Sequence, residues 1–121
     1  RVCMADGGGV VVGIEEAGFM SRAVQELNND PRLHGYALFG YPVDKDKVTR
    51  ALPFAARLSA GNVSLLNTHW TGDYLDEMCS FPNGTNDDQV DASSGAWAMI
   101  GDSTVAGAFN RASEQTFTNA F

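Results

Sequence analysis

Two apolar runs separated by an amphipathic segment constrain the fold of this chain more than any other feature. The runs occupy residues 9–16 (Gly-Val-Val-Val-Gly-Ile-Glu-Glu) and 35–41 (Gly-Tyr-Ala-Leu-Phe-Gly-Tyr). Such short apolar runs are typical of strands buried on both faces of a parallel sheet. Between them, apolar side chains recur at the spacing of one helix face over residues 19–28. The pattern predicts a βαβ unit and therefore an α/β fold.

The next segment predicts one helix and one short strand. Apolar residues share a helix face over residues 48–58, and Pro53 lies inside that pattern. The proline predicts either a kink or a helix that properly begins there. Val63 and Leu65 alternate with polar residues, which predicts a short edge strand.

Two more helices are predicted over residues 71–79 and 87–100, with a loop at 81–85 between them. The residues after 100 form a Ser-, Thr-, Asn- and Ala-rich tail for which we expect weak structure. Side chains expected in the core of this part are Tyr74, Leu75, Met78, Val90, Trp97 and Ile100.

Composition narrows the function classes. The 121 residues suit one domain, and 15 acidic against 8 Lys and Arg residues give a formal net charge of −7. That charge excludes nucleic-acid binding by bulk attraction, which needs a basic surface. The sequence shows neither an apolar run of about 20 residues nor a signal-peptide pattern. Two cysteines predict reduced cytosolic thiols rather than a disulfide framework. Because the chain begins with Arg1, we expect it to be part of a longer protein.

One candidate site lies at the end of the first predicted strand, where Glu15 and Glu16 are adjacent. Parallel sheets place their ligands at the carboxyl ends of strands. Strand side chains alternate, so only one of the two carboxylates faces a given side of the sheet. Two solvated acids leading into a helix N-terminus remain the simpler alternative.

A second candidate site is formed by Asp87, Asp88 and Asp91 at the start of the last predicted helix. Acids are favoured at helix starts, so capping alone accounts for part of this pattern. Three acids in five residues exceed what a cap needs, and Asp88 and Asp91 share a helix face. Clustered carboxylates are suitable ligands for Mg²⁺, and two such ions can promote phosphodiester hydrolysis.

Several motifs in order resemble the C-terminal nuclease domain of the large terminase subunit of tailed bacteriophages. The resemblance covers about residues 5–100, and the order of the motifs is more specific than any single one. They are the stretch 44–61 with Lys-x-x-Arg-Ala, then Asn62-Val63, Trp70, Tyr74-Leu75-Asp76-Glu77, and finally 81–92 with Phe-Pro-x-Gly and Asp-Asp-Gln-Val-Asp-Ala.

The resemblance implies an RNase H-like fold that cuts concatemeric DNA during genome packaging, with three acidic clusters holding two Mg²⁺ or Mn²⁺ ions. Glu16 matches the second acid of the family, with Glu15 as the fallback. The third cluster matches the three aspartates, of which Asp88 is the expected main ligand. The resemblance thus gives Glu16 and Asp88 as catalytic, and Glu16, Asp87, Asp88 and Asp91 as metal ligands. Lys47 and Arg50 match a basic pair that either contacts the DNA backbone or anchors the acidic site.

Two departures from the family pattern affect these expectations. Asn86 replaces the usual His, which removes a possible donor or base. The opening β-hairpin with the first catalytic Asp would precede residue 5, and Asp6 matches a later Asp-Gly instead. We therefore expect residues 1–121 to be part of a nuclease domain without its hairpin and upstream ATPase motor, and inactive alone.

The resemblance also implies partners and a location: double-stranded DNA, the terminase small subunit, the portal protein and the cytoplasm of the bacterial host, with no membrane. Two alternatives stay open from the sequence. One is a non-catalytic prophage remnant, and the other is an unrelated α/β binding module.

Overall fold

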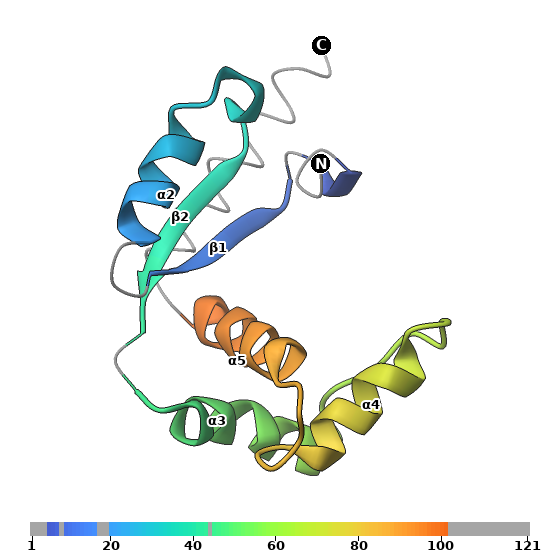
Figure 1. The fold of residues 1–121 in the computed structure, drawn as a ribbon. Helices are drawn as coiled ribbons and strands as arrows, with labels where there is room; N and C mark the ends of the chain where they lie inside the picture. The colour runs from blue at the N-terminus through green and yellow to red at the C-terminus, as the bar shows by residue number, and fades with distance from the viewer. Residues whose placement is uncertain (1–4, 8, 17–19, 44, 102–121) are drawn as a thin grey trace. The chain divides into compact units, whose positions relative to one another are not determined.

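A computed structural model describes residues 5–7, 9–16, 20–43 and 45–101 of the chain (Figure 1). The chain divides into two compact units, which are described separately. Unit 1 comprises Arg1–Asp44 and Met99–Phe121, and unit 2 comprises Lys45–Ala98. Apart from Gly101, the tail expected after residue 100 lies outside the described residues.

Unit 1 contains a parallel two-stranded sheet formed by β1 (Val11–Glu16) and β2 (Ala37–Pro42). The register pairs Val11 with Ala37 at one end and Glu16 with Pro42 at the other. The predicted adjacency and direction of the two strands are therefore confirmed.

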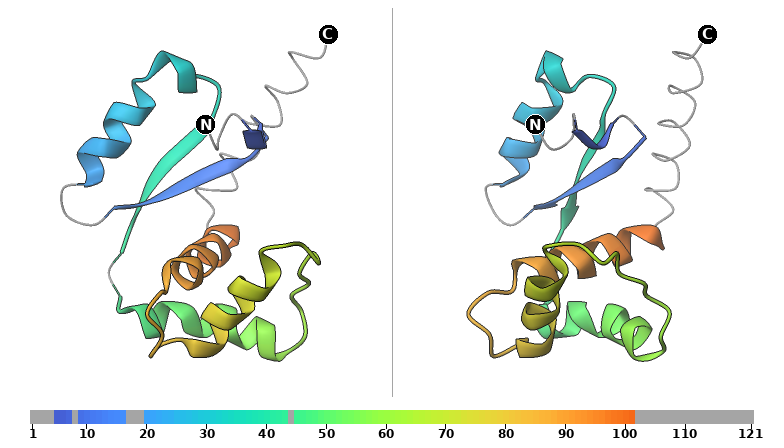
Figure 2. Two further views of the ribbon diagram at one scale, coloured as in Figure 1. Left: turned by 45° about the vertical axis from the view of Figure 1, so that its right-hand side comes forward. Right: turned by 90° about the vertical axis from the view of Figure 1, so that its right-hand side faces the viewer.

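Helix α2 (Met20–Asn28) connects the strands and packs against both of them on one side of the sheet, as the views in Figure 2 show. Val24 of α2 and Val11 of β1 are buried at 5% and 8% exposure, respectively. The short helix η1 (Pro31–Leu33) follows, and the Asp30 carboxylate caps it by accepting a hydrogen bond from the Arg32 amide. Helix α2 ends at Asn28, which is also the last residue of the predicted helical segment 19–28.

Unit 2 begins with helix α3 (Lys47–Ser59), capped by Asp46, whose carboxylate accepts a hydrogen bond from the Thr49 amide. The helix runs through Pro53, so the alternative in which it begins at that proline is wrong. Proline removes the donor to the carbonyl four residues earlier, that of Thr49. Because Thr49 and Pro53 are both exposed, water can satisfy this carbonyl.

The predicted edge strand at Val63 and Leu65 is wrong. Residues 62–68 have no regular secondary structure, and the described part of unit 2 contains no strand with which they could pair. An alternating pattern forms a strand only beside a partner, because its hydrogen bonds are made between strands.

Helices α4 (Thr71–Ser80) and α5 (Asp88–Ile100) confirm the last two predicted helices. Their buried residues differ in part from the expectation. Leu75 and Ile100 are exposed at 45% and 70%, whereas Val90 is buried at 3%. The buried residue of α4 is Glu77, whose carboxylate is hydrogen-bonded to the start of α5. No helix in the described part of the chain is long and apolar enough to span a bilayer.

Candidate functional site

The three aspartates lie at the start of α5, as expected, but they differ in position relative to the helix and in exposure. Asp87 precedes the helix, and its carbonyl accepts a hydrogen bond from the Asp91 amide, which closes the first helical turn. Asp88 is the first helical residue and its side chain is exposed. Asp91 lies one turn further along and is half-buried.

Two basic side chains from α3 hold Asp87 and Asp91. Lys47 Nζ lies 2.7 Å from Asp87 Oδ2 and 3.2 Å from Asp91 Oδ2. Arg50 Nη2 donates to Asp91 Oδ1 at 2.9 Å, and these two side chains are only 14% and 16% exposed. The hydrogen bonds to Asp87 and Asp91 raise the pKa of Lys47 above its usual value. The basic pair of the sequence motif therefore lies against the acidic cluster.

Asp88 differs from its two neighbours. Its carboxylate makes no hydrogen bond or ion pair with any other residue that the structure describes. In this cluster it is the carboxylate that is open to a ligand from solution.

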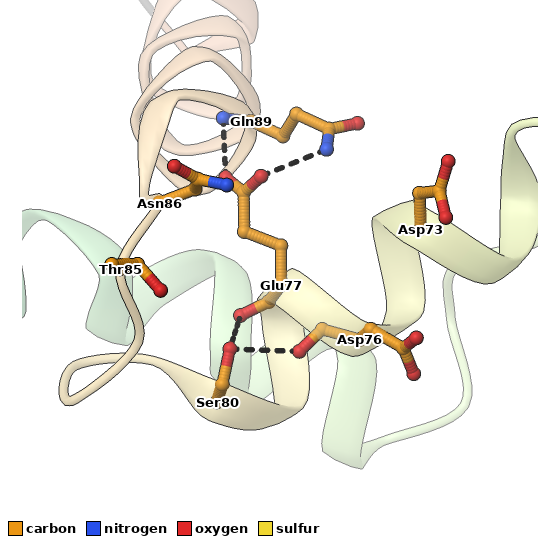
Figure 3. Close-up of a pocket in the computed structure, with 7 residues that line it drawn as sticks. All are labelled: Asp73, Asp76, Glu77, Ser80, Thr85, Asn86 and Gln89. Carbon is orange, nitrogen blue, oxygen red and sulfur yellow. Dashed lines mark hydrogen bonds between the residues drawn. The ribbon is translucent and has the colours of Figure 1, made fainter.

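Glu77 of α4 was not anticipated as part of this region. Its carboxylate accepts three hydrogen bonds, from the Gln89 amide (2.6 Å), the Val90 amide (3.2 Å) and Gln89 Nε2 (2.8 Å). Figure 3 shows this side chain directed at the first turn of α5, while Asp76 points away from it. The hydrogen bond from the Gln89 side chain, together with those from the two amides, keeps the pKa of Glu77 below its ordinary value of 4.5 despite the opposing effect of desolvation.

A pocket of about 520 Å³ adjoins Glu77 (Figure 3). It is lined by Asp73, Asp76, Glu77, Ser80, Thr85, Asn86 and Gln89. Asn86, which replaces the His of the family pattern, is exposed at this pocket and makes no hydrogen bond with another described side chain.

The lowered pKa of Glu77 predicts a pH-dependent stability. A carboxylate with a folded-state pKa below 4.5 stabilises the fold fully above that pH, and the contribution is lost as pH falls through the folded-state pKa. We expect Glu77→Gln to lower the melting temperature by about 5 °C at pH 6, with the difference shrinking as pH falls below 4.5. Melting curves followed by circular dichroism check this. Asp76→Asn is the control, and a difference independent of pH would contradict the prediction.

The other predicted site residues belong to unit 1. Glu16 ends β1, and its carboxyl group lies against Gly40 of β2, where a Cβ atom would overlap it. The adjacent Glu15 has an interaction partner in the structure. Because Glu16 and Asp88 lie in different units, a metal ion shared by them stays a prediction. Within the described ranges, no three His, Cys, Asp or Glu side chains are arranged to hold a metal ion.

Comparison with known families decides what kind of domain this is. The family model described as the terminase RNaseH-like domain matches residues 8–100, which is most of the chain. The chain belongs to this family. The resemblance to terminases and the RNase H-like α/β fold class are therefore confirmed, and an unrelated α/β binding module is excluded. No curated protein and no solved structure shows significant similarity to this terminase domain.

Glu77 is the residue of this terminase RNaseH-like domain that sequence reasoning missed. A signal was present, since Glu77 lies between Tyr74 and Met78 on the face of α4 expected to be apolar. A charged residue on such a face needs a hydrogen-bonding partner. Its partner, the start of α5, begins about ten residues later and is brought to it by the intervening loop.

Proposed function

We propose that this terminase RNaseH-like domain is the endonuclease part of a phage terminase large subunit. In this proposal it hydrolyses phosphodiester bonds of concatemeric double-stranded viral DNA with the help of divalent metal ions. The observation that carries the proposal is the exposed carboxylate of Asp88, which has no partner among the described residues and begins a helix whose other acids are held in place.

The donor set fits a hard cation. Mg²⁺ and Mn²⁺ take oxygen ligands, and Asp88 presents carboxylate oxygens without competing protein donors in the described part of the chain. We propose Glu16 and Asp88 as the catalytic ligands, with Asp87 and Asp91 as further ligands for two ions. Bound ions of this kind activate water and stabilise negative charge on a phosphodiester.

The ion pairs support an anchoring role for the basic pair. Arg50 is 14% exposed and its guanidinium faces Asp91, so little of it is left for a DNA backbone. Lys47 is half exposed and bridges Asp87 and Asp91. We propose that both residues hold α5 against α3 and offset the mutual repulsion of the acids.

The formal net charge of −7 bears on partners. An acidic domain gains little affinity for DNA from bulk electrostatics. We therefore propose that other parts of a packaging assembly bring the DNA to it, with the small subunit and the portal protein as partners in the bacterial cytoplasm.

A cleavage assay tests the function. The protein expressed from its natural reading frame is expected to cut plasmid DNA in Mn²⁺ or Mg²⁺ and to be inactive with EDTA. Because Glu16 is proposed as a ligand, Glu16→Gln is expected to lower the rate about 100-fold or more. The matched variant Glu15→Gln is expected to retain activity within about threefold, as measured by the same assay.

Two outcomes of the cleavage assay would contradict this assignment. Loss of activity in Glu15→Gln alone would move the ligand role to Glu15. Absence of metal-dependent cleavage in the unmodified protein would favour the alternative of a non-catalytic prophage remnant.

A further inference from the structure

The start of α5 is held from outside the helix. The first amides of a helix lack partners within it and are usually capped by the side chain of the preceding residue. Here that residue is Asp87, whose Oδ2 atom binds Lys47 at 2.7 Å. Glu77 of α4 instead accepts the Gln89 and Val90 amides, at 2.6 and 3.2 Å. The cap of α5 is thus supplied by another helix.

Both oxygens of Glu77 are used. Oε1 accepts the two backbone amides, and Oε2 accepts Gln89 Nε2 at 2.8 Å. Glu77 as a residue is only 9% exposed, so water competes weakly for these bonds. One more hydrogen bond, between Tyr74 Oη and Ser93 Oγ at 2.8 Å, joins the same two helices one turn further along α5.

These contacts hold the two residues that flank Asp88 in the sequence. Its predecessor Asp87 is held by Lys47, and its successor Gln89 is held by Glu77 through both backbone and side chain. The backbone of Asp88 is therefore fixed by its neighbours, while its carboxylate stays exposed.

We propose that Glu77 is a positioning residue for Asp88, fixing the first turn of α5 so that the Asp88 carboxylate is presented to a divalent cation. This inference rests on the proposed function and adds to it a residue that touches neither metal nor DNA. Residues that hydrogen-bond directly to metal ligands typically contribute 10- to 100-fold to metal affinity. Glu77 acts on Asp88 through the neighbouring residues Gln89 and Val90, so we expect an effect at the lower end of that range.

The test compares Glu77→Gln with Asp76→Asn in the protein expressed from its natural reading frame. Both variants remove one negative charge from α4, but Asp76 is exposed and its carboxylate makes no hydrogen bond with a described residue. The Kd for Mn²⁺ is measured from the electron paramagnetic resonance of the free ion, at a temperature where circular dichroism shows every variant folded. We expect the Kd to rise about tenfold in Glu77→Gln and less than twofold in Asp76→Asn.

A double variant separates positioning from loss of charge. In Glu77→Gln alone, the amide oxygen is a weaker acceptor for the two backbone N–H groups, and its NH2 group faces the NH2 group of Gln89. In Glu77→Gln with Gln89→Glu, that NH2 group donates to the new carboxylate, which restores the side-chain hydrogen bond with donor and acceptor exchanged. We expect this variant to recover the Mn²⁺ affinity to within about threefold of the unmodified protein. Hydrogen exchange of the Gln89 and Val90 amides should be faster in Glu77→Gln and return toward the original rate in the double variant.

The measured Kd values and amide exchange rates together decide whether Glu77 positions Asp88. An unchanged Kd in Glu77→Gln with faster amide exchange would show that Glu77 only stabilises the helix, and would overturn the inference while leaving the proposed function intact. A raised Kd in the double variant with restored amide protection would also overturn it, since charge at position 77 would then be responsible. If the unmodified protein binds no Mn²⁺, the proposed metal site fails, and the inference fails with it.

Discussion

Replacing Asp88 with Ala is expected to lower metal-dependent DNA cleavage about 100-fold or more while the domain stays folded. The carboxylate is exposed and makes no hydrogen bond or ion pair with another described residue that its loss would disrupt. Alanine is a strong helix former, so the loss of an acid in the first turn should cost no more than about 1 kcal/mol of stability. Plasmid cleavage and thermal melting of the same samples measure both effects.

Asp73→Ala is the matched control for this variant. Asp73 is likewise an exposed acid in the first turn of a helix, α4, and is not among the proposed ligands. The two variants carry the same charge change, so general electrostatic effects on DNA binding should be shared. Cleavage by the Asp88→Ala protein at the rate of the control would remove Asp88 from the site.

Replacing Arg50 with Ala should produce the largest loss of stability among the charged residues of α3. The Arg50 and Asp91 side chains are 14% and 16% exposed, so the stabilisation by this pair should lie between that of a surface pair and that of a buried pair. Exposed pairs contribute about 0–1 kcal/mol, whereas breaking a buried pair costs about 3–5 kcal/mol. We expect a decrease of about 2 kcal/mol in the free energy of unfolding, because Asp91 keeps its second partner, Lys47. Urea denaturation measures the decrease.

Arg22→Ala provides the comparison for this stability measurement. Arg22 pairs with Glu26 on the surface of α2, with side chains 86% and 70% exposed. Its loss should change the free energy of unfolding by less than about 0.5 kcal/mol. Equal losses in the two variants would show that the Arg50–Asp91 pair behaves as an ordinary surface pair.

The sequence predicts a strand correctly where the residue pattern of a segment and a neighbouring strand to pair with are both present. The two apolar runs and the helix between them form one βαβ unit, so each strand finds its partner within about 25 residues. The segment at Val63 and Leu65 has a similar alternating pattern but no strand beside it in the described part of unit 2. Periodicity describes one segment at a time, and a strand also requires a neighbour.

In the candidate site, too, the sequence reveals the residue types but not their spatial partners. The residue types at Asp87, Asp88 and Asp91 were visible in the sequence, and so was the basic pair of the family motif. Which carboxylate is bound by which cation was not visible, because Lys47 and Arg50 are about 40 residues away from their partners along the chain. Only the packing of α3 against α5 distinguishes the exposed Asp88 from its two neighbours.

The Glu77 cap also determines which charges the start of α5 attracts. A helix N-terminus with free amides is a natural seat for a phosphate group. In α5, two of those amides already face a carboxylate, and the preceding residue carries another. A phosphate of the DNA backbone therefore finds repulsion at this helix end, whereas a cation finds attraction. Under the proposed function, bound divalent ions would offset this negative charge and so lower the repulsion of a DNA phosphate at the start of α5.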